Sequence, residues 1–376
     1  MWNYKNLRRL DFRLVAILIL LMGLSLLVLS STTSPAVDGE WAGVITPHVK
    51  KQVQFFLVGW IAFLFLSGID YHKLRDWTWI LYVGMLVALL GLFFVPSIQN
   101  VHRWYRIGGF TLQPSEHAKL IVVLALSWFL EKKGAKTVEW KTVFQGLAVL
   151  MVPFALIYKQ PDLGTALVLL PIGLGMFYFG KIRRGVLVLM GSVALLGLSV
   201  STLLFFNILD HEELRPFATK VIKEYQYERL NPNTYHQKAA QTAIALGGVW
   251  GTGWRKSEFT RGQWLPAAHT DSVFPAFAEE FGLVGVALMM ALFVGLIARA
   301  LRVAAVAKDS FGRLLAAGIA IYLAIHIVMN LGMMSGFLPI TGVPLVVISY
   351  GGSSILAIMS ALGILQSIYT RRFTFS

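Results

Sequence analysis

The sequence predicts an all-α polytopic membrane protein, and three observations carry this prediction. Hydrophobic residues make up 56% of the 376 residues. Charged residues account for only 14%, well below the roughly 25% that is typical of soluble proteins. Apolar runs recur along the whole chain, and a run of about 18 or more residues is what a transmembrane helix requires.

Ten apolar runs are predicted to cross the bilayer, with one long exterior loop at 208–271 between spans seven and eight. Residues 1–376 are expected to form a single integral membrane domain. The first run follows a basic N-terminal segment and is expected to be a retained signal-anchor, because no small-residue cleavage site stands out. The predicted spans are 14–33, 52–69, 76–95, 115–131, 142–158, 163–180, 185–207, 272–298, 313–337 and 345–369.

The net charge of +14 is explained by membrane topology rather than by nucleic-acid binding. The basic residues lie between the apolar runs and do not gather on one soluble face, as a nucleic-acid-binding domain would require. Ten crossings place both termini on one side, and the segments on that side hold more than half of the Lys and Arg residues. Since basic loops face the cytoplasm, both termini are predicted to be cytoplasmic and the long loop to face out.

The long loop is predicted to contain two helices. Phe217, Val221 and Tyr225 recur at four-residue intervals, which suits either a helix in the membrane interface or a solvated helix on the loop's own small core. Tyr235 to Leu246 is predicted to form a second helix, which Gly247-Gly248 would end.

Polar groups at the exterior span ends are candidates for function, and each also has a structural explanation. Arg103 and Arg106 flank two aromatic residues, as in an interfacial anchor belt, but Arg also binds phosphate oxygens in bidentate fashion. Glu116 and Lys119 are three residues apart at the start of span four and can pair. Ionisable groups inside spans are functional candidates, and a purely structural ion pair is the alternative. Asp162 is either the N-cap of span six, a substrate contact, or both.

Two further polar features lie inside predicted spans. His326 and Asn330, four residues apart in span nine, are expected to make interhelical hydrogen bonds, with a proton relay as the alternative. Gly351-Gly352 lies inside predicted span ten and would permit close backbone approach or a local break.

The stretch from Trp264 to Ser272 is the candidate for the chemistry. It places His269-Thr270-Asp271 where the long polar loop re-enters an almost uncharged run, so a carboxylate there sits at a water–hydrocarbon boundary. The chain has no cysteine and no Ser-His-Asp, HExxH, Walker A or dinucleotide pattern. These absences exclude disulfides, a Cys nucleophile, membrane zinc proteases, ATP-driven pumps and Rossmann enzymes.

Five motifs in order make the chain resemble the SEDS family (the RodA, FtsW and SpoVE proteins), membrane glycosyltransferases that polymerise lipid II into peptidoglycan strands. The opening Leu10-Asp11-Phe12 is more similar to RodA than to FtsW. The motifs are Gln113-Pro114-Ser115-Glu116 with Lys119, Gln160-Pro161-Asp162-Leu163-Gly164-Thr165, Leu265-Pro266 with His269-Thr270-Asp271, Glu279-Glu280 with Gly282, and Pro339-Ile340-Thr341-Gly342-Val343-Pro344 with Ile348-Ser349-Tyr350-Gly351-Gly352-Ser353-Ser354.

The chain departs from the family pattern around this stretch. Ala267 stands where the family has Glu, Ser272 replaces an aromatic residue, and Pro275 enters the first turns of the next helix. The family's Gly-Lys-Gly is Gly251-Thr252-Gly253 here. The departures leave Asp271 in place and concern how the loop around it is anchored.

The resemblance implies a set of site residues. Asp271 would be the catalytic base that activates a sugar hydroxyl, while basic groups receive the pyrophosphate leaving group. A helix N-terminus next to Asp271 would lower its pKa and apolar neighbours would raise it, so the sequence leaves the balance open.

The substrate-binding residues would be Arg103 and Lys119 at the pyrophosphates, Glu116 positioning Lys119, and Asp162, His269, Thr270 and Glu280. A divalent cation, Mg²⁺ or Mn²⁺, is an optional cofactor that Asp162 or Asp271 would hold.

The resemblance also implies partners and a location. The expected partners are lipid II, the nascent glycan strand, a single-span class B penicillin-binding protein and other elongation-complex membrane proteins, with no nucleic acid. The location would be the bacterial cytoplasmic membrane, and the process cell elongation and shape. Two alternatives remain: a lipid II flippase without chemistry, and a scaffold that only activates a transpeptidase.

Overall fold

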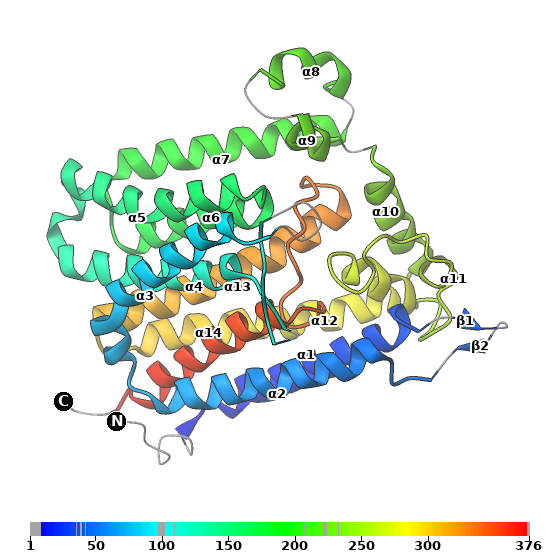
Figure 1. The fold of residues 1–376 in the computed structure, drawn as a ribbon, viewed down its shortest axis with the longest axis horizontal. Helices are drawn as coiled ribbons and strands as arrows, with labels where there is room; N and C mark the ends of the chain where they lie inside the picture. The colour runs from blue at the N-terminus through cyan, green and yellow to red at the C-terminus, as the bar shows by residue number, and fades with distance from the viewer. Residues whose placement is uncertain are drawn as a thin grey trace.

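The computed structural model describes residues 9–34, 36–37, 40–41, 43–96, 102–108, 110–206, 208–220, 224–231 and 233–373. Within these residues a helix lies at each of the ten predicted spans, so the all-α prediction is confirmed. Figure 1 shows these helices running roughly side by side as one bundle. They are α1 (Phe12–Thr32), α2 (Pro47–Gly68), α3 (Tyr71–Gly91), α4 (Pro114–Lys133), α5 (Trp140–Lys159), α6 (Leu163–Phe179), α7 (Arg184–Phe205), α12 (Val273–Val306), α13 (Ser310–Ser335) and α14 (Gly352–Thr370).

Local sequence signals explain where these helices begin. Five of the helices begin after an N-cap residue whose side chain accepts a hydrogen bond from a backbone N–H in the first turn. These N-cap residues are Asp11, Thr46, Asp70, Asp162 and Asp309. Such N-caps contribute about 1 kcal/mol each. The capping alternative predicted for Asp162 is therefore confirmed. Pro residues occupy the first turns of α2 and α4, where the missing N–H costs nothing.

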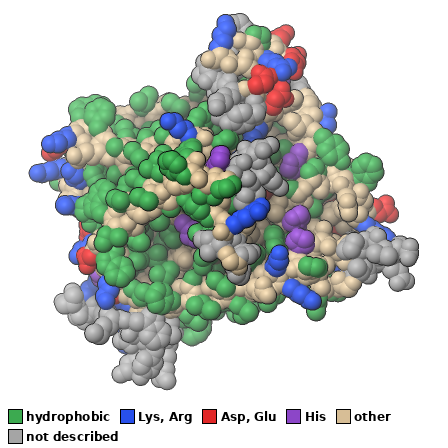
Figure 2. Space-filling view, viewed as in Figure 1, with side chains coloured by type: hydrophobic (Ala, Val, Ile, Leu, Met, Phe, Trp, Pro, Cys, Tyr) green, Lys and Arg blue, Asp and Glu red, His purple; other side chains and the backbone are tan. Residues whose placement is uncertain are grey.

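Eight of the described helices are long and apolar enough to cross a membrane, and α6 is shorter, at 17 residues. The tenth helix, α4, is also outside these eight, and it carries Glu116 and Lys119 in the bundle interior. The centre of the bundle is formed by α13 and α14, whereas α7 lies at the upper edge of Figure 1 and buries only Val186 and Leu204. Figure 2 shows hydrophobic side chains over most of this body.

The two ends of the bundle carry different parts of the chain. The N–H of Asp11, just before α1, donates to Gln366 Oε1 near the end of α14, at 2.9 Å. The first and last helices therefore meet at one end. The helices of the long loop lie at the opposite end (Figure 1).

The predicted boundaries of spans eight and ten differ most from the helices. Residues 345–351 are not helical, and α14 begins only at Gly352, because backbone and side-chain hydrogen bonds tie this segment to the loop before α12. The eighth span extends to Val306 and is broken at Gly282, whose φ of 60° and ψ of −165° are not helical. The N–H of Leu283 donates to the carbonyl of Gly248 at 2.9 Å, so the long loop closes the break.

The long loop contains several short helices, of which α10 packs most extensively on the bundle. The predicted helix at Tyr235–Leu246 is confirmed as α10, which contacts α12 and α13 and is capped by Gly248. The predicted Phe217–Val221–Tyr225 helix falls partly outside the described residues; α8 ends at Ala218. The loop holds α8 (His211–Ala218), α9 (Glu224–Tyr227), η4 (Glu228–Leu230), α10 (Tyr235–Gly247) and α11 (Glu258–Arg261).

The remaining elements are small. An antiparallel hairpin before α4 pairs Tyr105 with Leu112, and a second hairpin precedes α2. They are β1 (Ala36–Val37), β2 (Glu40–Trp41), β3 (Tyr105–Ile107) and β4 (Phe110–Leu112), with 3-10 turns η2 (Leu92–Phe94) and η3 (Gly134–Val138).

Candidate active site

Asp271 lies in a tight turn that leads into α12. The N–H groups of Thr270 and Ser272 both donate to the carbonyl of Ala267, at 3.0 and 3.1 Å. Ala267 adopts a φ of +51°, which an L-residue rarely does. The backbone carbonyl of Asp271 accepts a hydrogen bond from Asn330 Nδ2 on α13 at 3.0 Å. Its side chain is thus held by a fixed backbone at the loop end of the bundle.

The segment between α13 and α14 forms the wall opposite this turn. A β-carbon at Gly342 would lie 3.3 Å from Asp271 Oδ2, so the absence of a side chain lets the carboxylate approach the backbone. Ser349 Oγ donates to the carbonyl of Thr270 at 2.7 Å, and the N–H of Tyr350 donates to that of His269 at 3.0 Å. These bonds account for the late start of α14.

Asp162 forms the third side of the site at the N-terminus of α6. Its Oδ2 accepts from Gln113 Nε2 at 3.0 Å and from Ser115 Oγ at 2.9 Å. These partners belong to the Gln-Pro-Ser-Glu motif, so two motifs that are distant in the sequence meet here. Asp162 is 5% exposed.

Basic groups face Asp271 from two other segments. Arg103 is held by the carbonyls of Gln160 and Pro161, next to Asp162. Burial raises the pKa of Asp271, while Arg229, Arg103 and Asp162 modify it, the two arginines lowering it and Asp162 raising it. The pKa of Asp271 is raised above that of an ordinary aspartate, with burial as the largest cause, so its carboxylate is a stronger base.

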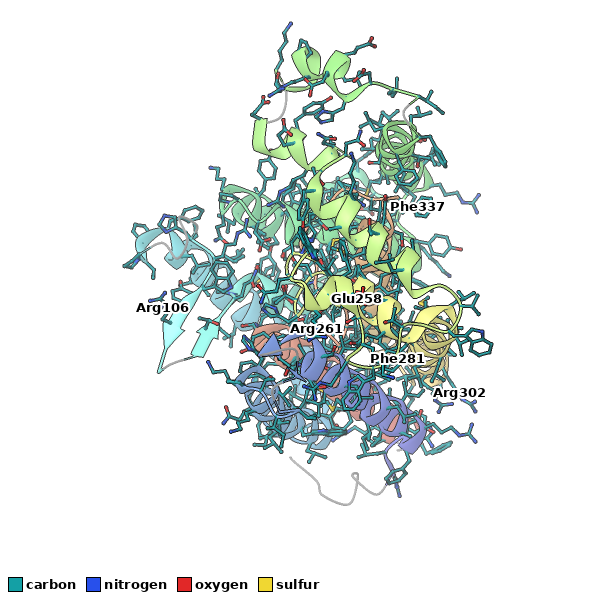
Figure 3. All side chains as sticks on the ribbon, turned by 90° about the vertical axis from the view of Figure 1, so that its right-hand side faces the viewer. Arg106, Glu258, Arg261, Phe281, Arg302 and Phe337 are labelled. Carbon is teal, nitrogen blue, oxygen red and sulfur yellow. The ribbon has the colours of Figure 1, made fainter. Side chains whose placement is uncertain are left out.

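Arg229 was missed in the sequence. It lies in η4 of the long loop and is one of several basic residues there, with no motif or spacing to mark it. Only the folding of the loop back over the bundle brings it near Asp271. Arg106, the other predicted arginine, lies on the exposed outer side of the β3–β4 hairpin (Figure 3).

His269 lies in an aromatic cluster beside the base. Its ring centroid is 5.2 Å from that of His48 and 6.1 Å from that of Tyr350. Burial, and then the neighbouring His48, lower the pKa of His269, and both effects favour the neutral ring. His48 belongs to α2, and no motif or spacing in the sequence marked it as a site residue. A further histidine, His236 of α10, contacts Ser272 Oγ through Nε2 at 2.7 Å.

Glu116 and Lys119 pair as predicted, but they lie inside the bundle. Lys119 Nζ is 2.7 Å from Glu116 Oε1, and the two residues are 1% and 3% exposed. Lys119 therefore does not present its ammonium group to the surface beside Arg103. Interhelical bonds were also expected for His326 and Asn330; Asn330 instead bonds two backbone carbonyls in the segments around Asp271.

Glu280 is placed away from Asp271, where it anchors the long loop. Its carboxylate accepts hydrogen bonds from Ser31 Oγ, from the N–H of Arg255 and from Ser257 Oγ. Glu279 does the same for α11 through Thr260 and the N–H of Phe259. Figure 3 shows α11, marked by Glu258 and Arg261, facing the viewer at the loop end.

Within the described part of the chain, neither Asp162 nor Asp271 belongs to a cluster of metal-ligand side chains. Among the described residues no group of three or more His, Cys, Asp or Glu side chains is placed to hold a metal ion. Both oxygens of Asp162 already accept hydrogen bonds. A Mg²⁺ ion held by one carboxylate and substrate phosphates needs no such cluster, and Asp271 fits that requirement better than Asp162.

Comparison with known proteins identifies relatives along almost the whole chain. The FtsW/RodA/SpoVE family model, described as cell cycle protein, matches residues 11–373. The chain is 30% identical over 354 residues to the peptidoglycan glycosyltransferase MrdB of Escherichia coli K12, covering 94% of this chain and 93% of that protein. It is 33% identical over 330 residues to a probable peptidoglycan glycosyltransferase FtsW of Geobacter sp. strain M18, covering 86% and 87%.

Solved structures share the fold. One is a chain from work on the structural coordination of polymerization and crosslinking by a peptidoglycan synthase complex, with a TM-score of 0.77, 28% identity and coverage of 97% of this chain and 99% of that chain. Another is the Thermus thermophilus rod shape determining protein RodA, with a TM-score of 0.70, 25% identity and coverage of 97% and 98%.

Proposed function

Since this chain belongs to the FtsW/RodA/SpoVE family, we propose that it polymerises lipid II into glycan strands with Asp271 as the catalytic base. The chain is an integral membrane protein and a peptidoglycan glycosyltransferase. The observation that supports the role of Asp271 is its setting. It is a partly buried carboxylate at the loop end of the bundle, with two arginines from different segments acting on it.

The reaction requires one base. A sugar hydroxyl of one substrate attacks the anomeric carbon of the other, the new C–O bond forms, and the bond to the lipid pyrophosphate breaks. The hydroxyl proton passes to the carboxylate of Asp271, and the electron pair leaves with the pyrophosphate. A positioned base contributes about 10²–10⁴-fold to the rate, and a raised pKa suits this role.

The leaving group requires positive charge rather than a proton. Arg103 and Arg229 are our candidates for the pyrophosphates, because both act electrostatically at Asp271 and guanidinium groups bind phosphate oxygens in bidentate fashion. Lys119 is buried against Glu116, so we propose that this pair supports the site structurally and does not contact the pyrophosphate. Asp162, His269 and Thr270 line it, and Glu280 acts through the loop. A divalent cation, if bound, would be held by Asp271 and would supply further positive charge for the pyrophosphate.

The cellular setting is part of the same proposal. The protein would act at the outer face of the bacterial cytoplasmic membrane, with both termini in the cytoplasm, and would serve cell elongation and shape. A class B penicillin-binding protein is the proposed partner, since a similar fold occurs in a synthase complex that coordinates polymerization and crosslinking.

A lipid II flippase is the second candidate, because the broken helix α12 and a buried ion pair also suit transporters. Purified protein in detergent separates the two, since no second leaflet exists there. We expect labelled lipid II to be converted to polymer. Intact lipid II after prolonged incubation with folded protein, together with transfer across vesicle membranes, would support transport instead.

A further inference from the structure

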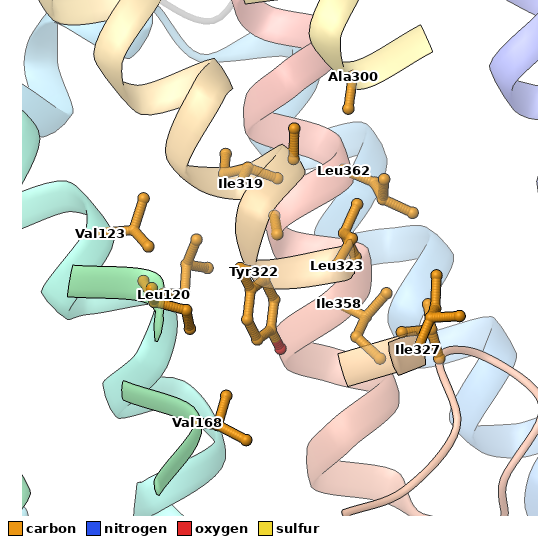
Figure 4. Close-up of a cluster of buried hydrophobic side chains, with 14 of the residues drawn as sticks. Leu120, Val123, Val168, Ala300, Ile319, Tyr322, Leu323, Ile327, Ile358 and Leu362 are labelled. Atoms are coloured by element: carbon orange, nitrogen blue, oxygen red, sulfur yellow. The ribbon is translucent and has the colours of Figure 1, made fainter. Parts of the chain in front are cut away.

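A row of polar side chains runs through the bundle core along one face of α13. Tyr322, His326 and Asn330 follow at four-residue intervals and so share a helix face, and each is 0% exposed. The rings of Tyr322 and His326 meet edge-on with centroids 4.8 Å apart. Figure 4 shows Tyr322 among apolar side chains, including Leu120 and Ile358. We call these three residues the α13 column.

One end of the α13 column meets the buried ion pair. Lys119 Nζ lies 5.9 Å from the centroid of the Tyr322 ring, and Glu116 holds this ammonium group at 2.7 Å. Since α4 and α13 pack directly against each other, the pair and the column form one continuous polar strip within an apolar bundle.

The other end of the α13 column reaches the site. Asn330 Nδ2 donates to the carbonyl of Asp271 at 3.0 Å and to that of Val343 at 2.8 Å. Two acceptors require the amide nitrogen here, which fixes the orientation of the side chain. Val343 follows Gly342, the residue against which the Asp271 carboxylate lies. A single amide therefore holds both walls of the site.

The α13 column and the neighbouring Glu116–Lys119 pair contain buried polar atoms that have no hydrogen-bond partner among the described residues. Glu116 Oε2, the Tyr322 hydroxyl and Asn330 Oδ1 are buried without a hydrogen-bond partner there. A ring nitrogen of His326 faces the carbonyl of Pro344 without reaching hydrogen-bond geometry. Within a bilayer such atoms must be satisfied internally, and buried water with about two to four polar contacts is the common solution.

We propose that Asn330 is a positioning residue for Asp271, and that buried water along the α13 column links it to the Glu116–Lys119 pair as one unit. Loss of the Asn330 amide frees the turn that carries Asp271 and lets solvent reach its carboxylate. Loss of the Tyr322 hydroxyl removes one contact of the water chain. The water that binds Asn330 Oδ1 is then held less firmly, and so is the Asn330 side chain. This inference rests on the proposed role of Asp271.

The test measures polymerisation of labelled lipid II by the purified full-length protein across a range of pH. The variants are Asn330→Ala, Tyr322→Phe and their combination. The matched control is Gln366→Ala, an equally buried amide that accepts a backbone hydrogen bond at the opposite end of the bundle. Thermal melting of each variant reports folding.

We expect Asn330→Ala to lower kcat about 10- to 100-fold with little change in KM, since a displacement near 1 Å at a reacting group has that effect. The acid limb of its pH profile moves to lower pH, because a more hydrated carboxylate has a lower pKa. Tyr322→Phe, which keeps its volume and so its folding, shifts the limb in the same direction. The combined loss is smaller than the product of the single losses, as for residues acting through one network.

Parental pH profiles for both single variants, or losses that simply multiply, would overturn the inference. The inference would also be overturned if Gln366→Ala shifted the acid limb of the pH profile as much as Asn330→Ala does. Failure of the proposed function is distinguishable: Asp271→Asn would then still make polymer, whereas failure of this inference alone leaves Asp271→Asn inactive and Asn330→Ala unchanged.

Discussion

Gly164, at the start of α6, lies so close to the carbonyl of Thr341 that a β-carbon on residue 164 would overlap that oxygen. Thr341 precedes Gly342, against which the Asp271 carboxylate lies, and Asp162 lies two residues before Gly164. This contact between two backbones therefore sets the spacing between the Asp162 and Asp271 sides of the site.

We expect Gly164→Ala to reduce polymerisation at least about 10-fold, because the added methyl group must displace the backbone beside Asp271 and small displacements of reacting groups are costly. Lipid II turnover by purified protein measures the effect. Gly197→Ala on α7 is the control, since a β-carbon there meets nothing within 4 Å. Equal turnover by the two variants would show that the spacing is not critical.

The pH dependence of turnover should respond in opposite directions to two substitutions. The base acts when deprotonated, so activity is lost as the pH falls through the pKa of Asp271. Arg229 lowers that pKa and Asp162 raises it. Arg229→Ala should therefore move the acid limb to higher pH and Asp162→Asn to lower pH, while Lys238→Ala, an exposed change on α10, should leave it in place. Shifts of the same sign would contradict the charge arrangement.

The stability of the fold should also report the buried carboxylate. Because burial raises the pKa of Asp271 in the folded protein, ionisation costs folding free energy as the pH rises above the unfolded value of about 3.9. Asp271→Asn should then melt at a higher temperature than the parent at neutral pH. The difference in melting temperature should shrink toward acid pH, where Asp271 is protonated in both the folded and the unfolded parent protein. A lower melting temperature at neutral pH would count against a desolvated carboxylate.

Glu279 is expected to be a structural residue of the loop. It is 0% exposed and accepts from the N–H of Phe259 and from the N–H and Oγ1 of Thr260. Glu279→Ala leaves these donors unsatisfied, which should cost about 2–4 kcal/mol. Trypsin should cut faster at Arg261 in this variant, and the exposed Glu258→Gln on α11 is the control. Equal cleavage rates would exclude this anchoring role.

The sequence predicted the helices because apolar runs of spanning length leave little choice of structure. It did not predict the break at Gly282 or the late start of α14 at Gly352. Both depend on hydrogen bonds to distant loops, such as Leu283 to Gly248 and Ser349 to Thr270, and hydropathy contains no such information.

Some of the residues that the fold gathers around Asp271 were among the predicted site residues. Resemblance selected Asp271, Arg103 and Asp162, and the fold brings them within electrostatic reach of one another. It could not find Arg229 or His48, because their proximity to Asp271 and His269 depends on how distant segments pack. It also placed Lys119 with the surface cations, since three-residue spacing predicts pairing but not the depth of the pair in the bundle.

The most direct test of the central claim compares Asp271→Asn with the parent protein, both purified and folded, in polymerisation of labelled lipid II in detergent. Substitution by Asn keeps the shape of the side chain and removes the base. We predict that polymer falls below detection while binding of lipid II and the melting profile at acid pH persist. Polymer formation by Asp271→Asn at the parental rate would contradict the account.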